Sequence, residues 1–206
     1  MVKHGTGWGA MTGIISAEWA KKGFTGSGTS FDDVSCESWF EDFGERYIMA
    51  EGDGVEFKEI PSCSWGHPAI NELQKMMKIN GINRKSIDQI KVYGFSEMAN
   101  MCSRIPESEE EAQFSVIWPM ALVLVHGRVT IEGMKSDSFS DPEVRSMADR
   151  IEVIETEELD ELNKSLSRDT GETSAWPSRI IIKTKEGREF DSGTVVSEPV
   201  ELASMD

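Results

Sequence analysis

Residues 7–22 combine large apolar side chains at helical spacing with glycine and alanine between them, and this segment limits the folds open to the chain. The large residues are Trp8, Met11, Ile14, Ile15 and Trp19. Apolar residues three or four positions apart share one face of a helix, and small residues let a neighbouring helix approach closely. A helix that is apolar on nearly all sides needs other helices around it, yet the remaining sequence offers few. We therefore expect residues 1–50 to be a remnant of an all-α helical domain followed by a connector.

Helix and strand patterns are mixed from residue 51 onward, without a repeating alternation of strand and helix. Helices are expected at 68–79, 107–126 and 142–150, a short one near 36–43, and strands at 87–93 and 151–154, with a hairpin in 179–190. Pro119 falls inside the second of these helices and should kink it. The pattern predicts an α+β domain over residues 51–206, in which helices pack on a small sheet.

The net charge and the cysteine pattern indicate which partners and which cell compartment to expect. The chain has 206 residues with a formal net charge of −16, and such a surface repels phosphate backbones and anionic lipids, which argues against nucleic acid and membrane partners. No apolar run approaches the roughly 20 residues that cross a bilayer, and the start lacks the order of a signal peptide. Three cysteines without a CxxC pair fit a reducing, cytoplasmic location.

His67 is the first residue to consider for chemistry, because it immediately precedes the proline that starts a predicted helix. Backbone N–H groups and the positive end of the helix dipole converge there, so an imidazole can hold or protonate a carboxylate, hydroxyl or enolate oxygen. The alternative is a histidine that only caps or packs. A metal site made of Cys63 and His67 has no third ligand nearby in the sequence, so we expect no metal and no other cofactor.

Residues 58–70, KEIPSCSWGHPAI, resemble the stretch K-x-Y-P-[SC]-C-x-x-x-H-x-x-[IL] of the MmgE/PrpD family, with Ile60 in place of the aromatic residue. Looser matches follow in the same order along most of the chain, at 7–10, 22–26, 112–115, 141–145 and 183–188. The resemblance implies the C-terminal part of a dehydratase of the 2-methylcitrate dehydratase type. Its α+β part would then be a lid-type domain.

The resemblance also implies roles for particular residues. In that family the matching histidine lies in the active site between a helical domain and the lid, so His67 becomes the candidate catalytic residue. Lys58 and Lys3 would contact the carboxylates of the substrate, although Lys3, like His4, is equally well an ordinary terminal residue. Trp118 stands where many members have a tyrosine after the F-S motif, and an indole donates a hydrogen bond but cannot act as an acid or base.

The implied reaction is the metal-independent removal or addition of water on a small tricarboxylate such as 2-methylcitrate. Decarboxylation and epimerisation are sibling activities that the sequence does not separate. No part of the chain resembles the Asp- and His-containing catalytic segment of the family's helical domain. We therefore expect either an incomplete lyase, completed in a homo-oligomer or by a separate helical-domain chain, or a non-catalytic relic or module that binds a metabolite or a partner. An unrelated acidic α+β domain is a third alternative.

Overall fold

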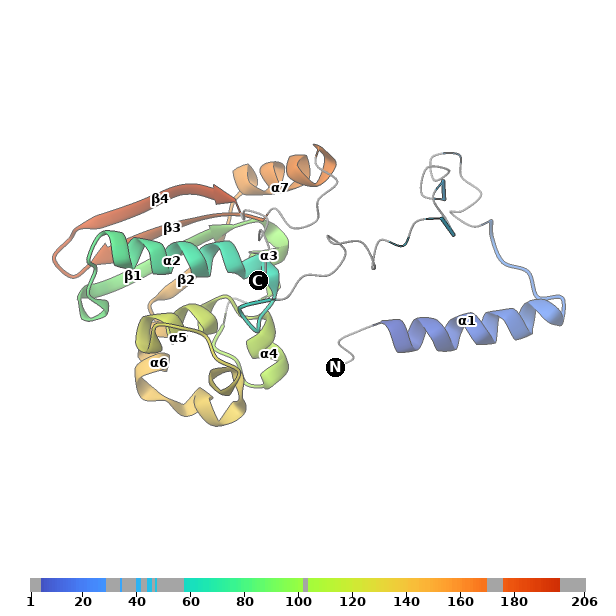
Figure 1. The fold of residues 1–206 in the computed structure, drawn as a ribbon, viewed down its shortest axis with the longest axis horizontal. Coiled ribbons are helices and arrows are strands. Elements are labelled where there is room, and N and C mark those ends of the chain that lie inside the picture. The colour runs from blue at the N-terminus through green and yellow to red at the C-terminus, as the bar shows by residue number, and fades with distance from the viewer. Residues whose placement is uncertain are drawn as a thin grey trace. The chain divides into compact units, whose positions relative to one another are not determined.

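The computed structural model describes residues 5–28, 34, 40–41, 44–45, 47, 58–101, 104–169 and 176–196. The chain divides into two units, Met1–Phe57 and Lys58–Asp206, and each is considered by itself (Figure 1). The short helix expected near 36–43 falls largely outside the described residues, as do Lys3 and His4.

The first unit contains helix α1, Thr6–Lys21, which confirms the helix expected from the apolar spacing. The helix ends just before Gly23, which has a positive φ of 86° and donates its N–H to the Ala20 carbonyl at 2.9 Å. Glycine adopts this left-handed conformation without the steric cost that other residues meet. None of the residues of α1 is buried in the structure, and Trp8, Ile14 and Trp19 are 55%, 69% and 52% exposed.

The second unit is built on a four-stranded sheet with the order β2-β1-β3-β4. The strands are β1 (Ile87–Gly94), β2 (Ile151–Glu155), β3 (Pro177–Thr184) and β4 (Glu189–Val196). β1 pairs in parallel with β2 and antiparallel with β3, and β3 pairs antiparallel with β4. Ile90 lies opposite both Ile151 and Ile182, so the alternation of side chains puts these three residues on one face. The strands predicted at 87–93 and 151–154 and the predicted hairpin are confirmed.

Helices accompany this sheet in the order α2 (His67–Ile79), α3 (Ser96–Met101), α4 (Glu109–Phe114), α5 (Ile117–His126), α6 (Pro142–Ala148) and α7 (Glu157–Asp169). Four short 3-10 turns complete the described elements, η4 (Ser64–Gly66), η5 (Arg84–Ser86), η6 (Glu132–Met134) and η7 (Ser136–Ser140). The mixture confirms the α+β class. No helix in the described part of the chain combines the length and apolar character needed to cross a bilayer.

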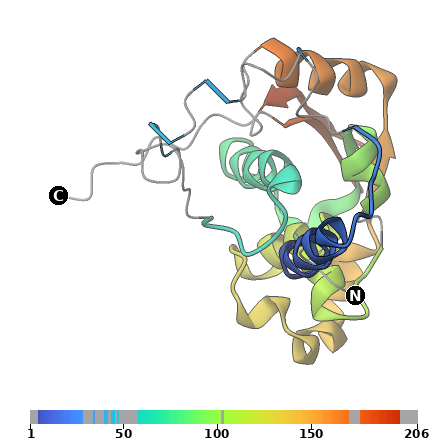
Figure 2. The same cartoon turned by 90° about the vertical axis from the view of Figure 1, so that its right-hand side faces the viewer.

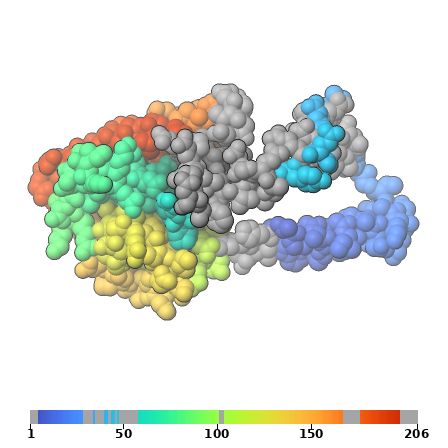
Figure 3. Space-filling view, in the orientation of Figure 1, coloured from blue at the N-terminus to red at the C-terminus, as the bar shows by residue number. Residues whose placement is uncertain are grey.

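The core lies where α2 and α5 meet the sheet. α2 contacts β3, β4 and α5, while α5 contacts β2 and α6, and Figure 2 shows α2 above the α5 and α6 pair. Leu73 of α2 and the strand residues Ile90, Ile180 and Ile182 have no exposed surface. On the face seen in Figure 3, α2 forms the middle of the surface between β4 and α5. One side of α2 therefore remains at the surface of this unit.

The helix predicted over 107–126 is wrong as a single element, because the structure has two helices with a break between Phe114 and Ile117. Ser115 is extended there, with φ −84° and ψ 134°, and its hydroxyl accepts the Trp118 N–H at 3.0 Å. Pro119 consequently falls in the first turn of α5. The N–H groups of a first turn have no intrahelical partner, so a proline there costs no hydrogen bond and the expected kink is not needed.

Candidate functional site

The candidate site lies at the N-terminal end of α2, in residues 58–67, which we call the site loop. His67 is the first residue of α2 and is half-buried. Its predecessor Gly66 packs so closely on α5's N-cap residue Val116 that a Cβ atom at Gly66 would lie 3.1 Å from Val116 Cγ2. Cys63 donates its N–H to the Gln113 carbonyl of α4 at 2.7 Å. The site loop is therefore held against the junction of α4 and α5.

An aromatic cluster anchors the other side of the site loop. The Trp65 ring lies edge-on to Phe95 and to Trp176, with centroid distances of 5.7 Å and 5.8 Å. Phe95 follows β1 and Trp176 precedes β3, and their rings stack at 5.8 Å. Aromatic pairs at such distances add stability beyond the area they bury. Trp65, two residues before His67, thus ties the start of α2 to the sheet.

The main-chain carbonyl of Ser62 brings His67 and Lys58 together. His67 Nε2 lies 3.2 Å from this oxygen, and Lys58 Nζ donates to it at 3.5 Å. The Ser62 hydroxyl is buried and has no hydrogen-bond partner among the described residues. An imidazole, an ammonium group and the start of a helix converge here, and such an arrangement can hold an anion.

The structure places the Trp118 side chain in the core, next to η6 and η7. Trp118 has no exposed surface, its Nε1 donates to the Gly133 carbonyl at 2.9 Å, and its ring lies edge-on to Phe139. Its burial favours a structural role over the substrate-binding role expected from the resemblance. Lys3 lies outside the described residues, so its role stays a prediction. No group of three His, Cys, Asp or Glu side chains in the described ranges could hold a metal ion.

The pKa of the His67 imidazole lies below its ordinary value of 6.5. The main cause is burial, which disfavours the charged ring, and the positive charge of Lys58 acts in the same direction. The carbonyls of Ser62 and Ile60 oppose the shift, because they stabilise a protonated ring. At neutral pH the ring is therefore uncharged.

His67 should make the protein less stable as the pH falls. The unfolded chain binds a proton at this residue with the ordinary pKa of 6.5, so protonation below that pH favours the unfolded state. The contribution is fully present above the unfolded pKa and is lost as the pH falls toward the lower folded pKa. We expect His67→Gln to flatten the decline in the free energy of unfolding between about pH 7 and pH 5, measured by urea unfolding. Parallel curves for the two proteins would contradict this.

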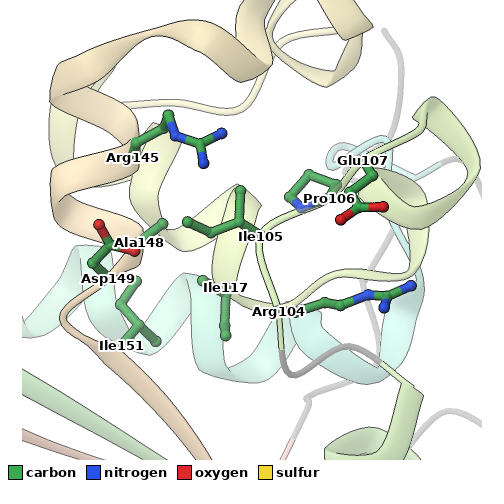
Figure 4. Close-up of a pocket in the computed structure, with 9 residues that line it drawn as sticks. All are labelled: Arg104, Ile105, Pro106, Glu107, Ile117, Arg145, Ala148, Asp149 and Ile151. Carbon is green, nitrogen blue, oxygen red and sulfur yellow. The ribbon is translucent and has the colours of Figure 1, made fainter.

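A separate hollow of about 440 Å³ lies between residues 104–107, which precede α4, the start of α5, and the C-terminal half of α6 (Figure 4). Its charged lining residues are Arg104, Glu107, Arg145 and Asp149, together with apolar Ile105, Pro106, Ile117, Ala148 and Ile151. The two positive and two negative groups balance, and Arg104 forms an ion pair with Glu111. Arg145 donates to the Phe139 carbonyl at 2.9 Å. Since the hollow contains neither His67 nor Lys58, the site loop remains the place where the predicted site residues meet.

The family comparison covers this same unit. The model of the MmgE/PrpD C-terminal domain matches residues 60–198, which include His67, the sheet and α2 to α7. The chain belongs to the MmgE/PrpD family. Membership confirms the resemblance carried by the site-loop motif and places the matched residues in the C-terminal part of MmgE/PrpD proteins. No curated protein matches the chain.

Ser62 is the site residue that sequence reasoning missed. It occupies the position after proline where the MmgE/PrpD-like stretch has serine or cysteine, and its contribution is made by the main-chain carbonyl. A main-chain contact places no requirement on the side chain, so residue types alone do not reveal it. The signal that was present is Pro61, whose fixed φ favours a turn at this point; Ser62 N–H donates to the Ile60 carbonyl at 2.8 Å within it.

Proposed function

We propose that this chain binds a small tricarboxylate, such as 2-methylcitrate, at the site loop, as the lid part of a lyase that removes or adds water. The observation that supports this best is the convergence of His67 and Lys58 on the Ser62 carbonyl at the start of α2, in a domain of the MmgE/PrpD family. The net charge of −16 repels an anion elsewhere on the surface, so a locally cationic place is needed for binding.

In the proposed reaction a proton leaves the carbon next to a carboxylate and hydroxide leaves the neighbouring carbon, which forms a carbon–carbon double bond and water. His67 would exchange the proton, and Lys58 would neutralise carboxylate charge. Lys3 is proposed as a second cationic contact. The remaining acid and base groups would come from a helical domain, in a homo-oligomer or on a separate chain, in the cytoplasm.

Citrate should perturb the amide signals of the site loop and of the first turn of α2 in a chemical-shift titration. Lys58→Ala should raise the dissociation constant about tenfold, because a hydrogen bond between charged groups contributes roughly 1.5 to 3 kcal/mol. His67→Ala should raise it less, about fivefold, because a neutral imidazole makes an ordinary hydrogen bond that contributes roughly 1 kcal/mol. The matched controls are Lys78→Ala, at the other end of α2, and His126→Ala, at the end of α5. Shifts confined to other surfaces, or equal losses with the control variants, would remove this site.

A non-catalytic role is the second candidate, and the burial of Trp118 favours it. Its only donor is engaged with Gly133, and no phenol stands at this position to act as an acid or base. A relic, or a module that binds a metabolite or a partner, would keep the anion site without turnover.

The purified chain should show no measurable dehydration of 2-methylcitrate by itself, because one histidine and a few lysines do not replace a full set of acid and base groups. A turnover assay decides this, with a co-purifying helical chain added back where one is found. Saturable turnover by the chain alone, abolished in His67→Ala, would show that the chain contains more catalytic groups than we assign. Turnover that is seen only after the helical chain is added would favour the lyase over the non-catalytic role.

A further inference from the structure

The main hydrogen bond of the His67 ring within the described part of the chain joins Nε2 to the Ser62 main-chain oxygen at 3.2 Å, and the Ile60 carbonyl is a second acceptor with a smaller effect on the ring. A carbonyl oxygen can only accept a hydrogen bond, so Nε2 must carry the hydrogen. A neutral imidazole has a single N–H, and the other nitrogen then has a bare lone pair. The contact therefore determines which nitrogen of His67 is free to take a proton.

We propose that the Ser62 carbonyl is a positioning group, which holds His67 as the Nε2–H tautomer and leaves Nδ1 as the proton acceptor offered to the ligand. This inference rests on the proposed function for its ligand. The tautomer itself is a property of the free protein. In a transfer step the ligand would release a proton to Nδ1, and the resulting imidazolium would keep its Nε2–H bond to Ser62.

The surroundings of Ser62 fix the position of this oxygen. Ser62 N–H is bound to Ile60 and the following N–H, that of Cys63, is bound to Gln113 of α4, so the peptide unit between Ser62 and Cys63 cannot easily rotate. Ser62 is also only 6% exposed, which keeps water from competing for the carbonyl. The Ile60 carbonyl accepts the Ser62 N–H at 2.8 Å, and its effect on the His67 ring is smaller than that of the Ser62 carbonyl.

Lys58 donates to the same oxygen. A carbonyl has two lone pairs, and the Lys58 ammonium at 3.5 Å can share it with the imidazole. Its charge also disfavours a second proton on the ring. Both effects point to a neutral His67 that accepts a proton, and they argue against a protonated ring that donates one at neutral pH.

The tautomer can be read from ring nitrogen shifts in the full chain labelled with ¹⁵N-histidine, at neutral pH and without ligand. The sequence has three histidines, and the signals missing from His67→Gln identify those of His67. We expect Nε2 to resonate as a protonated nitrogen and Nδ1 as a bare one. An Nδ1–H ring, or two averaged signals, would overturn the inference whether or not citrate binds.

Two variants separate the carbonyl from the rest of the residue. Ser62→Ala removes the hydroxyl and keeps the carbonyl, so the two ring ¹⁵N shifts of His67 should be unchanged. A change in these shifts would assign the effect to the hydroxyl and overturn the inference. Pro61→Gly loosens the turn that holds the Ser62 carbonyl. The chemical shifts of Nδ1 and Nε2 should then move toward each other, because the second tautomer becomes populated. Shifts that stay at the values of a pure Nε2–H ring would show that the Ser62 carbonyl does not select the tautomer.

Citrate then tests the ligand separately. It should shift Nδ1 by much more than Nε2, because Nδ1 meets the ligand and Nε2 stays bound to Ser62. If the ring is the Nε2–H tautomer but its nitrogen shifts do not change with citrate, the proposed function is wrong and the tautomer assignment is still supported. A response larger at Nε2 than at Nδ1 would refute the role of Nδ1.

Discussion

Replacing Trp118 with alanine should lower the free energy of unfolding by about 3 to 5 kcal/mol. The indole has no exposed surface, so its removal leaves a cavity between α5 and η6 and η7 that the surrounding elements can fill only in part. It also removes the edge-on contact with Phe139 at 5.4 Å. Urea unfolding monitored by circular dichroism gives the change, and a loss below about 1 kcal/mol would show that the core does not depend on this side chain.

Trp118→Phe provides the matched control for that experiment. Phenylalanine keeps most of the ring and loses the hydrogen bond from Nε1 to the Gly133 carbonyl. That carbonyl also accepts the Ser138 hydroxyl at 2.6 Å, so it is not left without a donor. We therefore expect a smaller loss, of about 1 to 2 kcal/mol. Equal losses for alanine and phenylalanine would assign the effect to the hydrogen bond and not to packing.

Aspartate at Trp8 or Ile15 should abolish association of the chain through α1. We propose that α1 forms an intersubunit or inter-domain contact, because the large apolar residues of this helix are exposed, among them Trp8 at 55% and Ile15 at 40%. Apolar area left in water forfeits roughly 25 cal/mol per Å². An aspartate buried without a partner costs about 3 to 5 kcal/mol, which raises a dissociation constant more than a hundredfold.

Light scattering over a concentration series measures this association. Thr6→Asp adds the same charge to the same helix about 200° around its axis from Trp8, and it should weaken association much less. A monodisperse monomer that neither Trp8→Asp nor Ile15→Asp alters would mean that α1 is covered within the chain or is not formed. Equal effects from all three variants would point to general charge repulsion.

Helix starts with a strong local signal were predictable from the sequence. Pro68 marks the first turn of α2, and Asp141 accepts the N–H groups of Glu143 and Val144 at the start of α6, as the Asp-Pro-Glu pattern indicates. The break between α4 and α5 was not predictable in the same way, because apolar residues continue through it. Ser115 lies at the break, where its hydroxyl accepts the Trp118 N–H, and a single serine within an apolar run does not by itself predict such a contact.

Short elements set by tertiary contacts also escaped prediction. Helix α3 is six residues long, too short for a periodic pattern, and its position depends on Met98 packing against Gly94. A Cβ atom at Gly94 would lie 2.7 Å from Met98 Sδ, so a larger residue there would require the end of the Met98 side chain to shift. Met98 itself is buried, with 1% of its surface exposed.

The candidate site was predictable in part. The family-like motif identified His67 and Lys58, and the structure shows that they meet at one carbonyl. The resemblance placed Trp118 where many family members have a tyrosine. A match in sequence position does not determine whether the side chain faces the ligand or the core. Trp118 lies in the first turn of α5, and its indole faces Gly133 and Phe139 in the core.

The attachment of the site loop to α4 and α5 has a consequence for the entropy of ligand binding. Cys63 is hydrogen-bonded to Gln113 and Gly66 is packed on Val116, so a ligand at His67 would not have to order this backbone. Among the residues that meet at the Ser62 carbonyl, the exposed Lys58 side chain has the most freedom to lose, and immobilising such a side chain costs about 0.5 to 1.5 kcal/mol. A rigid ligand of the right charge would therefore bind this loop with little loss of protein motion, and its affinity would depend mainly on desolvation of the carboxylates.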